Sequence, residues 1–195
     1  MEKQVHDIKN LLLRPVETFK ALKTDSVSKS ELTKSLLLYL AAIPAIAGFL
    51  GKVVIGTSVP FYGYYRVSFF SGLWHAVLLF IFAVLGIYIL SFITHKLSPK
   101  FGGIDDDLSA FKLIVMSYVP LFILGVSSLI PALSGLYILG LYGIYLFYVG
   151  VPVMMECSEE KALPFTVVIS LISIVLTVLF YRIAALAIVN SVPNL

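Results

Sequence analysis

The chain has 195 residues, of which 59% are hydrophobic and only 13% are charged, and its mean hydropathy is +1.00. Soluble domains carry about 25% charged residues, so this chain has too few charges to cover a surface that faces water. The composition excludes a soluble enzyme, a nucleic-acid-binding domain and a disordered tail protein. A single cysteine, Cys157, excludes a secreted disulfide scaffold. We therefore expect an all-α integral membrane protein with no cofactor and no nucleic-acid partner.

Residues 1–33 form a charged segment that precedes the first apolar run. Its apolar residues recur at steps of three and four, which predicts one apolar helical face. Arg14-Pro15 is expected to divide the segment into two short helices, with Pro15 at the first position of the second. The basic residues favour an interfacial segment on anionic inner-leaflet lipids. The alternative is a segment packed against the ends of the membrane spans.

Residues 34–190 contain long runs without charged side chains, and these runs predict the membrane spans. A helix needs roughly 20 residues to cross the hydrocarbon, so the uncharged run from Leu113 to Met155 must cross twice. Pro131 and Gly135 mark the turn between those two crossings. The prediction is a five-span helical bundle with spans at about 34–55, 70–94, 109–130, 135–155 and 162–188.

The charges also predict an orientation in the membrane. With the N-terminus cytoplasmic, eleven Lys and Arg residues fall on the inner side, against Lys52, Arg66 and Arg182 on the outer side. The positive-inside rule therefore predicts a cytoplasmic N-terminus and a C-terminus outside, in the cell (plasma) membrane. All eleven acidic residues fall on the inner side in this arrangement.

The titratable residues do not form a pattern that is typical of an active site. His75 and His95 are about 30 Å apart along one helix, and His75 follows Trp74 near the outer interface, where anchoring or packing is expected. The run 105–107 of three Asp residues either caps the third span or pairs with His95, Lys96 and Lys100, and binding of a divalent cation is a further alternative. Cys157, among glutamates, is expected to be inert. The sequence therefore predicts a protein that is not an enzyme and has no metal site.

Polar and small residues inside the spans are the candidate functional residues. A hydroxyl stripe on the fifth span either lines a path for a polar solute or is a seam for helix packing; it comprises Thr166, Ser170, Ser173, Thr177 and Tyr181. The fourth span has a candidate helix-packing face at Gly140, Gly143 and Gly150. Pro44, Pro120 and Pro152 each break a helical hydrogen bond and are candidate hinges or static kinks.

Arg182 is the only charged residue in the second half of the fifth span. It lies about 30 Å beyond Ala162, so it should reach the outer interface. Two partners are expected for its guanidinium: lipid phosphate, reached by snorkelling, and the aromatic cluster Phe61, Tyr62, Tyr64 and Tyr65.

Six short motifs, in order along nearly the whole chain, resemble the Yip (Ypt/Rab-interacting protein) membrane family in its short prokaryotic form. They are Arg14-Pro15-x-Glu17-x-Phe19, Ile43-Pro44-Ala45, Ser117-Tyr118-x-Pro120, Gly140-Leu141-Tyr142-Gly143-x-Tyr145, Gly150-Val151-Pro152-Val153-Met154 and Glu160-Lys161-Ala162. The resemblance implies a five-span bundle with a cytoplasmic N-terminus. Eukaryotic relatives are associated with Rab GTPases and vesicle traffic, and they carry a long cytoplasmic domain where this chain has only about 33 residues.

Two functions remain open at this stage. The first is a non-enzymatic membrane scaffold or interaction protein, which recruits a membrane or cytoplasmic protein partner through its inner face and N-terminal segment. The second is a small transporter or channel for a polar solute or ion, acting as a homo-oligomer and using the hydroxyl stripe. A cavity between the third, fourth and fifth spans would discriminate between them.

Overall fold

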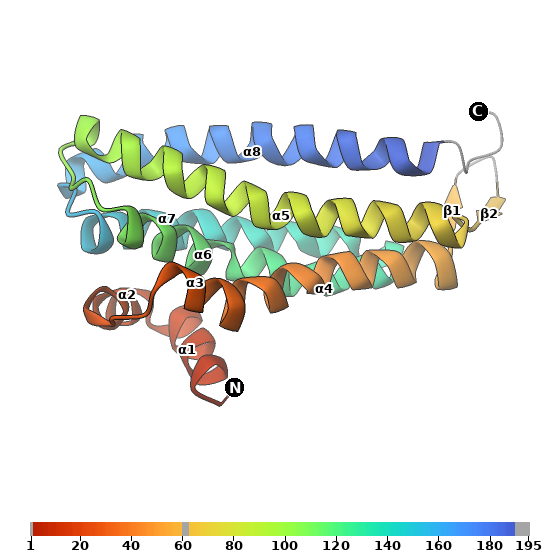
Figure 1. Ribbon diagram of the computed structural model, residues 1–195, viewed down its shortest axis with the longest axis horizontal. Coiled ribbons are helices and arrows are strands. Elements are labelled where there is room, and N and C mark those ends of the chain that lie inside the picture. The colour runs from red at the N-terminus through yellow and green to blue at the C-terminus, as the bar shows by residue number, and fades with distance from the viewer. Residues whose placement is uncertain (1, 60–62, 190–195) are drawn as a thin grey trace.

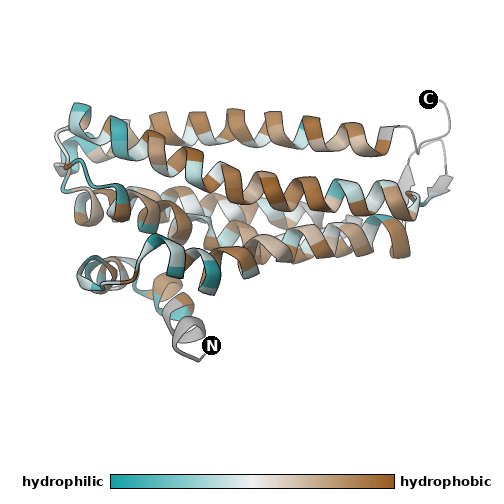
Figure 2. Cartoon of the chain, in the orientation of Figure 1, coloured by the Kyte–Doolittle hydropathy of each residue, from teal (hydrophilic) through white to brown (hydrophobic). Residues whose placement is uncertain are grey.

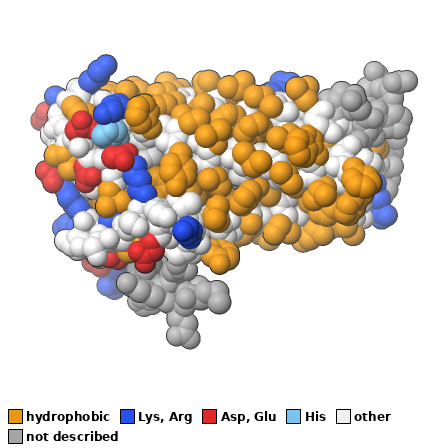
Figure 3. Space-filling model, viewed as in Figure 1, with side chains coloured by type: hydrophobic (Ala, Val, Ile, Leu, Met, Phe, Trp, Pro, Cys, Tyr) orange, Lys and Arg blue, Asp and Glu red, His pale blue; other side chains and the backbone are white. Residues whose placement is uncertain are grey.

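The computed structural model describes residues 2–59 and 63–189, and these form an elongated helical bundle (Figure 1). Five helical segments are long and apolar enough to cross a membrane: Lys29–Ile55, Phe69–Phe101, Asp107–Leu129, Gly135–Met154 and Glu159–Ile188. The expected number of spans is therefore confirmed. The described acidic residues gather at one end of the bundle, and apolar side chains cover its length (Figures 2 and 3).

The first two spans run along one side of the bundle. The first consists of α3 (Lys29–Leu32), the π-helical η1 (Thr33–Leu37), α4 (Leu38–Phe49) and the π-helical η2 (Leu50–Ile55). The second is α5 (Phe69–Leu97), which ends in the short 3₁₀ helix η3 (Ser98–Phe101). A small antiparallel hairpin of β1 (Thr57–Val59) and β2 (Gly63–Tyr65) connects them, with Thr57 opposite Tyr65.

The last three spans complete the bundle. The third is α6 (Asp107–Leu124) with the 3₁₀ helix η4 (Gly125–Leu129), and the fifth is α8 (Glu159–Val189). The fourth differs from the uniform α-helix expected, because it begins as an eleven-residue 3₁₀ helix, η5 (Pro131–Leu141), before α7 (Tyr142–Met154). Runs of 3₁₀ helix longer than about four residues are uncommon, and η5 leaves this span only half α-helical.

Helix α6 forms the centre of the bundle. In its most apolar stretch 72% of the residues are buried, against 17% for the fifth span. The outer helices α5 and α8 instead expose large apolar side chains such as Phe70 and Leu186. An apolar surface of this extent is not found on soluble monomers, and it fits a lipid environment.

The N-terminal segment forms two helices, α1 (Glu2–Leu13) and α2 (Pro15–Thr24), with Pro15 at the first position of α2 as expected. Helix α2 packs against the bundle, where Phe19 is fully buried. The Lys112 ammonium, only 2% exposed, donates to the carbonyl oxygens of Leu22 at 3.0 Å and Asp25 at 2.5 Å. Of the two arrangements left open by the sequence, α2 adopts the packed one. Helix α1 packs at its C-terminal end, where Leu11 is buried and Tyr142 donates to the Leu12 carbonyl oxygen, and its axis points away from the spans (Figure 1).

Each of the three Asp residues in the run 105–107 has a different partner. Asp106 caps α6, accepting from the Leu108 amide at 2.9 Å and the Ser109 hydroxyl at 2.6 Å. Burial acts to raise its pKa, but these hydrogen bonds and the Lys112 charge hold the pKa below its ordinary value. Asp105 lies 2.6 Å from His95 Nδ1, and Asp107 pairs with Lys29. Within residues 2–59 and 63–189, no group of three His, Cys, Asp or Glu is arranged to hold a metal ion.

Candidate functional site

Two adjacent pockets that share lining residues lie between the spans, and together they form a two-chambered cavity. The larger, of about 560 Å³, is bounded by the first, second, third and fifth spans, with contributions from η4 and η5. The smaller, of about 240 Å³, is bounded by the third, fourth and fifth spans together with Leu90 of α5. Five residues line both chambers and mark their junction: Leu90, Tyr118, Leu121, Tyr137 and Thr177.

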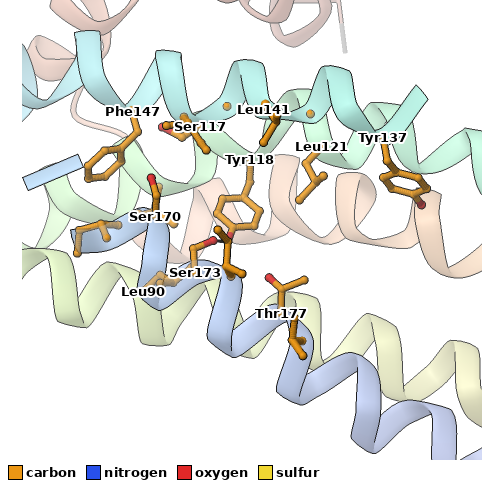
Figure 4. Close-up of a pocket in the computed structure, with 17 residues that line it drawn as sticks. Leu90, Ser117, Tyr118, Leu121, Tyr137, Leu141, Phe147, Ser170, Ser173 and Thr177 are labelled. Atoms are coloured by element: carbon orange, nitrogen blue, oxygen red, sulfur yellow. Dashed lines mark hydrogen bonds between the residues drawn. The ribbon is translucent and has the colours of Figure 1, made fainter. Parts of the chain in front are cut away.

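The smaller chamber is mainly apolar, and several of its hydroxyl groups are engaged in hydrogen bonds (Figure 4). The Tyr118 hydroxyl of α6 lies 2.5 Å from the Ser173 hydroxyl of α8. Ser117 donates to the Leu113 carbonyl oxygen at 2.8 Å within α6. Apolar cavities of this kind stay dry and accept apolar molecules, so the chamber is suited to a hydrocarbon group.

The smaller chamber opens at the side of the bundle. Leu141 and Ile144 on the fourth span and Ile174 and Val178 on α8 line it, yet all four side chains are exposed. Because the surface around these residues is apolar, the opening faces the region that lipid tails would occupy. A molecule dissolved in the bilayer can therefore reach the chamber without crossing water.

Four members of the predicted hydroxyl stripe line the cavity. Ser170, Ser173 and Thr177 face the smaller chamber, and Thr177 and Tyr181 face the larger one. Thr166 is buried away from both chambers and donates to the Ala162 carbonyl oxygen at 2.7 Å. Most of the stripe therefore lines the cavity, and Thr166 instead bonds the backbone of its own helix.

The far end of the larger chamber carries Lys52, whose ammonium lies beside His75 and Tyr181. Lys52 Nζ lies 3.2 Å from His75 Nε2 and 5.9 Å from the centre of the Tyr181 ring. His75 is only 1% exposed, and its ring packs edge-on against Tyr181. The ionisable side chains of two neighbouring spans thus meet inside the bundle near the hairpin end.

The three candidate packing glycines of the fourth span face other helices closely. A Cβ atom at Gly143 would collide with the backbone carbonyl oxygen of Ser117 on α6. One at Gly140 would lie 2.7 Å from Leu121 Cδ1, and one at Gly150 would lie 2.9 Å from the Phe19 ring. Glycine at these positions lets α6, the fourth span and α2 approach one another.

The three candidate hinge prolines occupy different surroundings. Pro44, inside α4, lines the larger chamber and contacts Gly125, where an added Cβ would lie 2.6 Å from Pro44 Cβ. Pro120 is buried in α6 one turn before the helix gives way to η4. Pro152 lies two residues before the end of α7. Their role as hinges stays a prediction.

Arg182 is exposed on α8, and within the described part of the chain it forms no salt bridge. Of its predicted aromatic partners, Phe61 and Tyr62 lie outside the described residues. The snorkelling of Arg182 to lipid phosphate therefore stays a prediction.

Sequence reasoning assigned Lys52 to the outer side of the membrane, at the end of the first span, and missed its place in the cavity. It also missed Tyr118 and Tyr137, which lie at the junction of the chambers. One signal was present: Lys52 and His75 are the ionisable residues at the adjoining ends of consecutive spans. Polar residues that meet at such a position often mark a functional site.

Comparison with known proteins gives a match over most of the chain. The model of the Yip1 domain matches residues 9–181. The inner membrane protein YohC of Escherichia coli strain K12 is 29% identical over 137 residues, which cover 67% of this chain and 69% of YohC. YohC of Escherichia coli O6:H1 matches to the same extent. No solved structure matches.

Proposed function

This chain belongs to the Yip1 domain family, and we propose that it is a non-enzymatic carrier that binds an amphiphile from the bilayer in its two-chambered cavity. The observation that carries the proposal is the lateral opening of the smaller chamber between the fourth span and α8. An opening on the apolar surface admits molecules that are already dissolved in lipid. The larger chamber, at about 560 Å³, falls within the range of about 300–1,000 Å³ that is typical of ligand pockets.

An amphiphile fits this cavity better than a polar solute or an ion does. A path for a polar solute needs hydrogen-bonding groups that are free to replace water, but Tyr118 and Ser173 are bonded to each other. Most of the remaining lining consists of Leu, Ile, Val and Phe side chains. These side chains favour burial of a hydrocarbon chain, which contributes about 0.8 kcal/mol per methylene group.

We propose that the carrier lies in the plasma membrane with its N-terminus in the cytoplasm. The relative YohC is named as an inner membrane protein, and the basic residues of this chain are concentrated at the end of the bundle that bears α2. In a Cys157→Ala background, Gly63→Cys should react with an impermeant thiol reagent added outside intact cells, and Ser158→Cys should not. The reverse labelling would overturn the orientation.

Filling the larger chamber tests the carrier function. Gly48 and Gly86 line the larger chamber, and Cβ atoms there would meet only Ser128 at 3.9 Å and the Phe180 ring at 3.5 Å, so both positions accept a Cβ without a backbone clash. The double variant Gly48→Leu/Gly86→Leu should lose most of the lipid that co-purifies with the wild-type protein, as counted by native mass spectrometry. Gly135→Leu is the matched control, because nothing lies within 4 Å of its added Cβ. Equal lipid retention by both variants would contradict the proposal.

A second candidate, an interaction scaffold, is favoured by the helix α1 that points away from the bundle (Figure 1). Leu13, at its end, is 70% exposed, and its neighbours Leu12 and Val16 are also exposed. Such residues can insert into a membrane surface or contact a partner. A fluorophore on Leu13→Cys in the Cys157→Ala background should shift to shorter wavelength in anionic proteoliposomes compared with zwitterionic ones. Identical spectra would remove contact with anionic inner-leaflet lipids from this candidate function.

A further inference from the structure

We propose that the cavity selects an amphiphile with an anionic head, a carboxylate or phosphate that pairs with the Lys52 ammonium while its chain extends into the two chambers. This inference rests on the proposed carrier function and adds the chemical class of the ligand. Within the described residues, the site combines a cation that has no Asp or Glu partner, hydrogen-bond donors and an apolar lining.

Lys52 has no Asp or Glu side chain within reach. The sequence contains no Asp or Glu from residue 32 to residue 104 and none after Glu160. Along the first span, Glu31 and Lys52 are separated by about 31 Å of helix. The acidic residues of α2, α3, α6 and α8 lie at the end of the bundle opposite the hairpin (Figure 1). A cation inside the membrane with no anionic partner is costly, and an anionic ligand would remove that cost.

The Lys52 ammonium also has unused donors. It carries three N–H groups, and a neutral His75 ring can accept only one hydrogen bond. Within the described residues, Lys52 Nζ makes no hydrogen bond to any side chain other than His75. Two N–H groups are thus available to oxygen atoms of a head group, and charge-assisted hydrogen bonds of this type are among the stronger ones in proteins. The Tyr181 hydroxyl belongs to a residue that lines the same chamber.

The rest of the cavity favours an amphiphile over a small free anion. From Tyr181 to Ser170, the lining residues of α8 extend over about 16 Å. Along this length the lining changes from the Lys52 end of the larger chamber, past Tyr118 and Leu121, which line both chambers, to the mainly apolar smaller chamber. A free anion would fill only the Lys52 end, whereas an attached acyl chain would also fill the apolar part.

The proposal is tested with the full-length protein, delipidated in an uncharged detergent. Four ligands are titrated while binding is followed by native mass spectrometry: oleate, oleyl alcohol, phosphatidylglycerol and phosphatidylethanolamine. Oleate or phosphatidylglycerol should bind about tenfold more tightly than its uncharged or zwitterionic counterpart. Preference for oleate over oleyl alcohol identifies a free fatty acid as the source of the anion, and preference for phosphatidylglycerol over phosphatidylethanolamine identifies a phospholipid.

Three variants tie the preference to the proposed residue. Lys52→Gln should abolish the tenfold preference, Lys52→Arg should keep most of it, and Lys34→Gln, near the opposite end of the same span, should leave it unchanged. Melting temperatures identify any variant that fails to fold, and Lys52→Arg then decides the result. Equal binding of all four ligands, or a preference that survives in Lys52→Gln, would overturn the inference but not the carrier function. Binding of none of them by the wild-type protein would overturn both.

Discussion

The contact between Gly143 and the central helix α6 allows a sharp test of the packing. A Cβ atom at Gly143 would overlap the carbonyl oxygen of Ser117, which belongs to the backbone of a buried helix. Since that oxygen cannot move without moving α6, Gly143→Ala should separate the fourth span from α6. Overpacking of this kind costs about 1–3 kcal/mol.

Gly86→Ala is the matched control for this experiment. Its added Cβ would lie 3.5 Å from the Phe180 ring, which is an ordinary contact. Alanine is a better helix former than glycine by about 0.5–1 kcal/mol, so Gly86→Ala should be neutral or stabilising. The same gain is available at Gly143, which makes the expected destabilisation there a net effect of two opposing terms.

Thermal unfolding in detergent measures the difference between the two variants. For soluble domains of about this size, 1 kcal/mol shifts the melting temperature by about 2–4 °C. Gly143→Ala should therefore melt several degrees below the wild type, and Gly86→Ala at or above it. If both variants shift equally, or if Gly143→Ala is the more stable, the close approach of the fourth span to α6 is refuted.

Three further predictions concern the charged end of the bundle. Lys112→Met should release α2, because the hydrogen bonds from the buried ammonium to the carbonyls of Leu22 and Asp25 contribute about 1.5–3 kcal/mol each. A protease should then cut residues 14–28 of Lys112→Met faster than those of the control variant Lys9→Met, and equal cleavage rates would contradict the role of Lys112. Asp106→Ala should lower the free energy of unfolding by about 0.5–2 kcal/mol at pH 7 through loss of the helix cap. Because the pKa of Asp106 is held below its ordinary value of 3.8, the stability difference from the wild type should persist at pH 5 and vanish only as the pH falls through that lower pKa; a difference that is already absent at pH 5 would contradict this cause. Burial raises the pKa of the Cys157 thiol above its ordinary value of 9.0, so alkylation at pH 8 should be slower in the folded protein than in denaturant, and equal rates would show that the thiol is accessible.

The span architecture was predictable because charge and hydropathy determine it directly. Residues inside the hydrocarbon must be apolar and helical, so uncharged runs mark the spans whatever their packing. Pro15 was predictable as a helix start because its ring fixes the backbone and its missing N–H needs no partner there. These features depend on the chemistry of neighbouring residues and on their hydropathy, and both can be read from a single sequence.

Features that depend on contacts between distant residues were not predictable. The sequence left the position of α2 open because an amphipathic face fits a lipid surface and a protein surface equally well. Contacts about 90 residues apart decide it, between Lys112 and the carbonyls at the end of α2. The turn of Lys52 into the cavity depends in the same way on His75 and Tyr181. The 3₁₀ form of η5, where a uniform α-helix was expected, is not indicated by the helix propensities of its residues.

The packing of the bundle indicates which wall of the cavity can move. The wall formed by α6 and the fourth span is tight, because Gly143 touches the α6 backbone and Phe19 of α2 closes the contact at Gly150. The wall formed by α8 is more exposed, since most of that helix faces outward, although Phe180 stacks on Phe82 of α5 and Phe165 packs on Phe147 of α7. A bulky chain could widen the side opening by moving one of these walls, and α8 is the less buried of the two, with 17% of its most apolar stretch buried against 28% for the fourth span. The hydrogen bond between Ser173 and Tyr118 spans this boundary at the smaller chamber, so it is the contact that a ligand entering from the bilayer would have to break or replace.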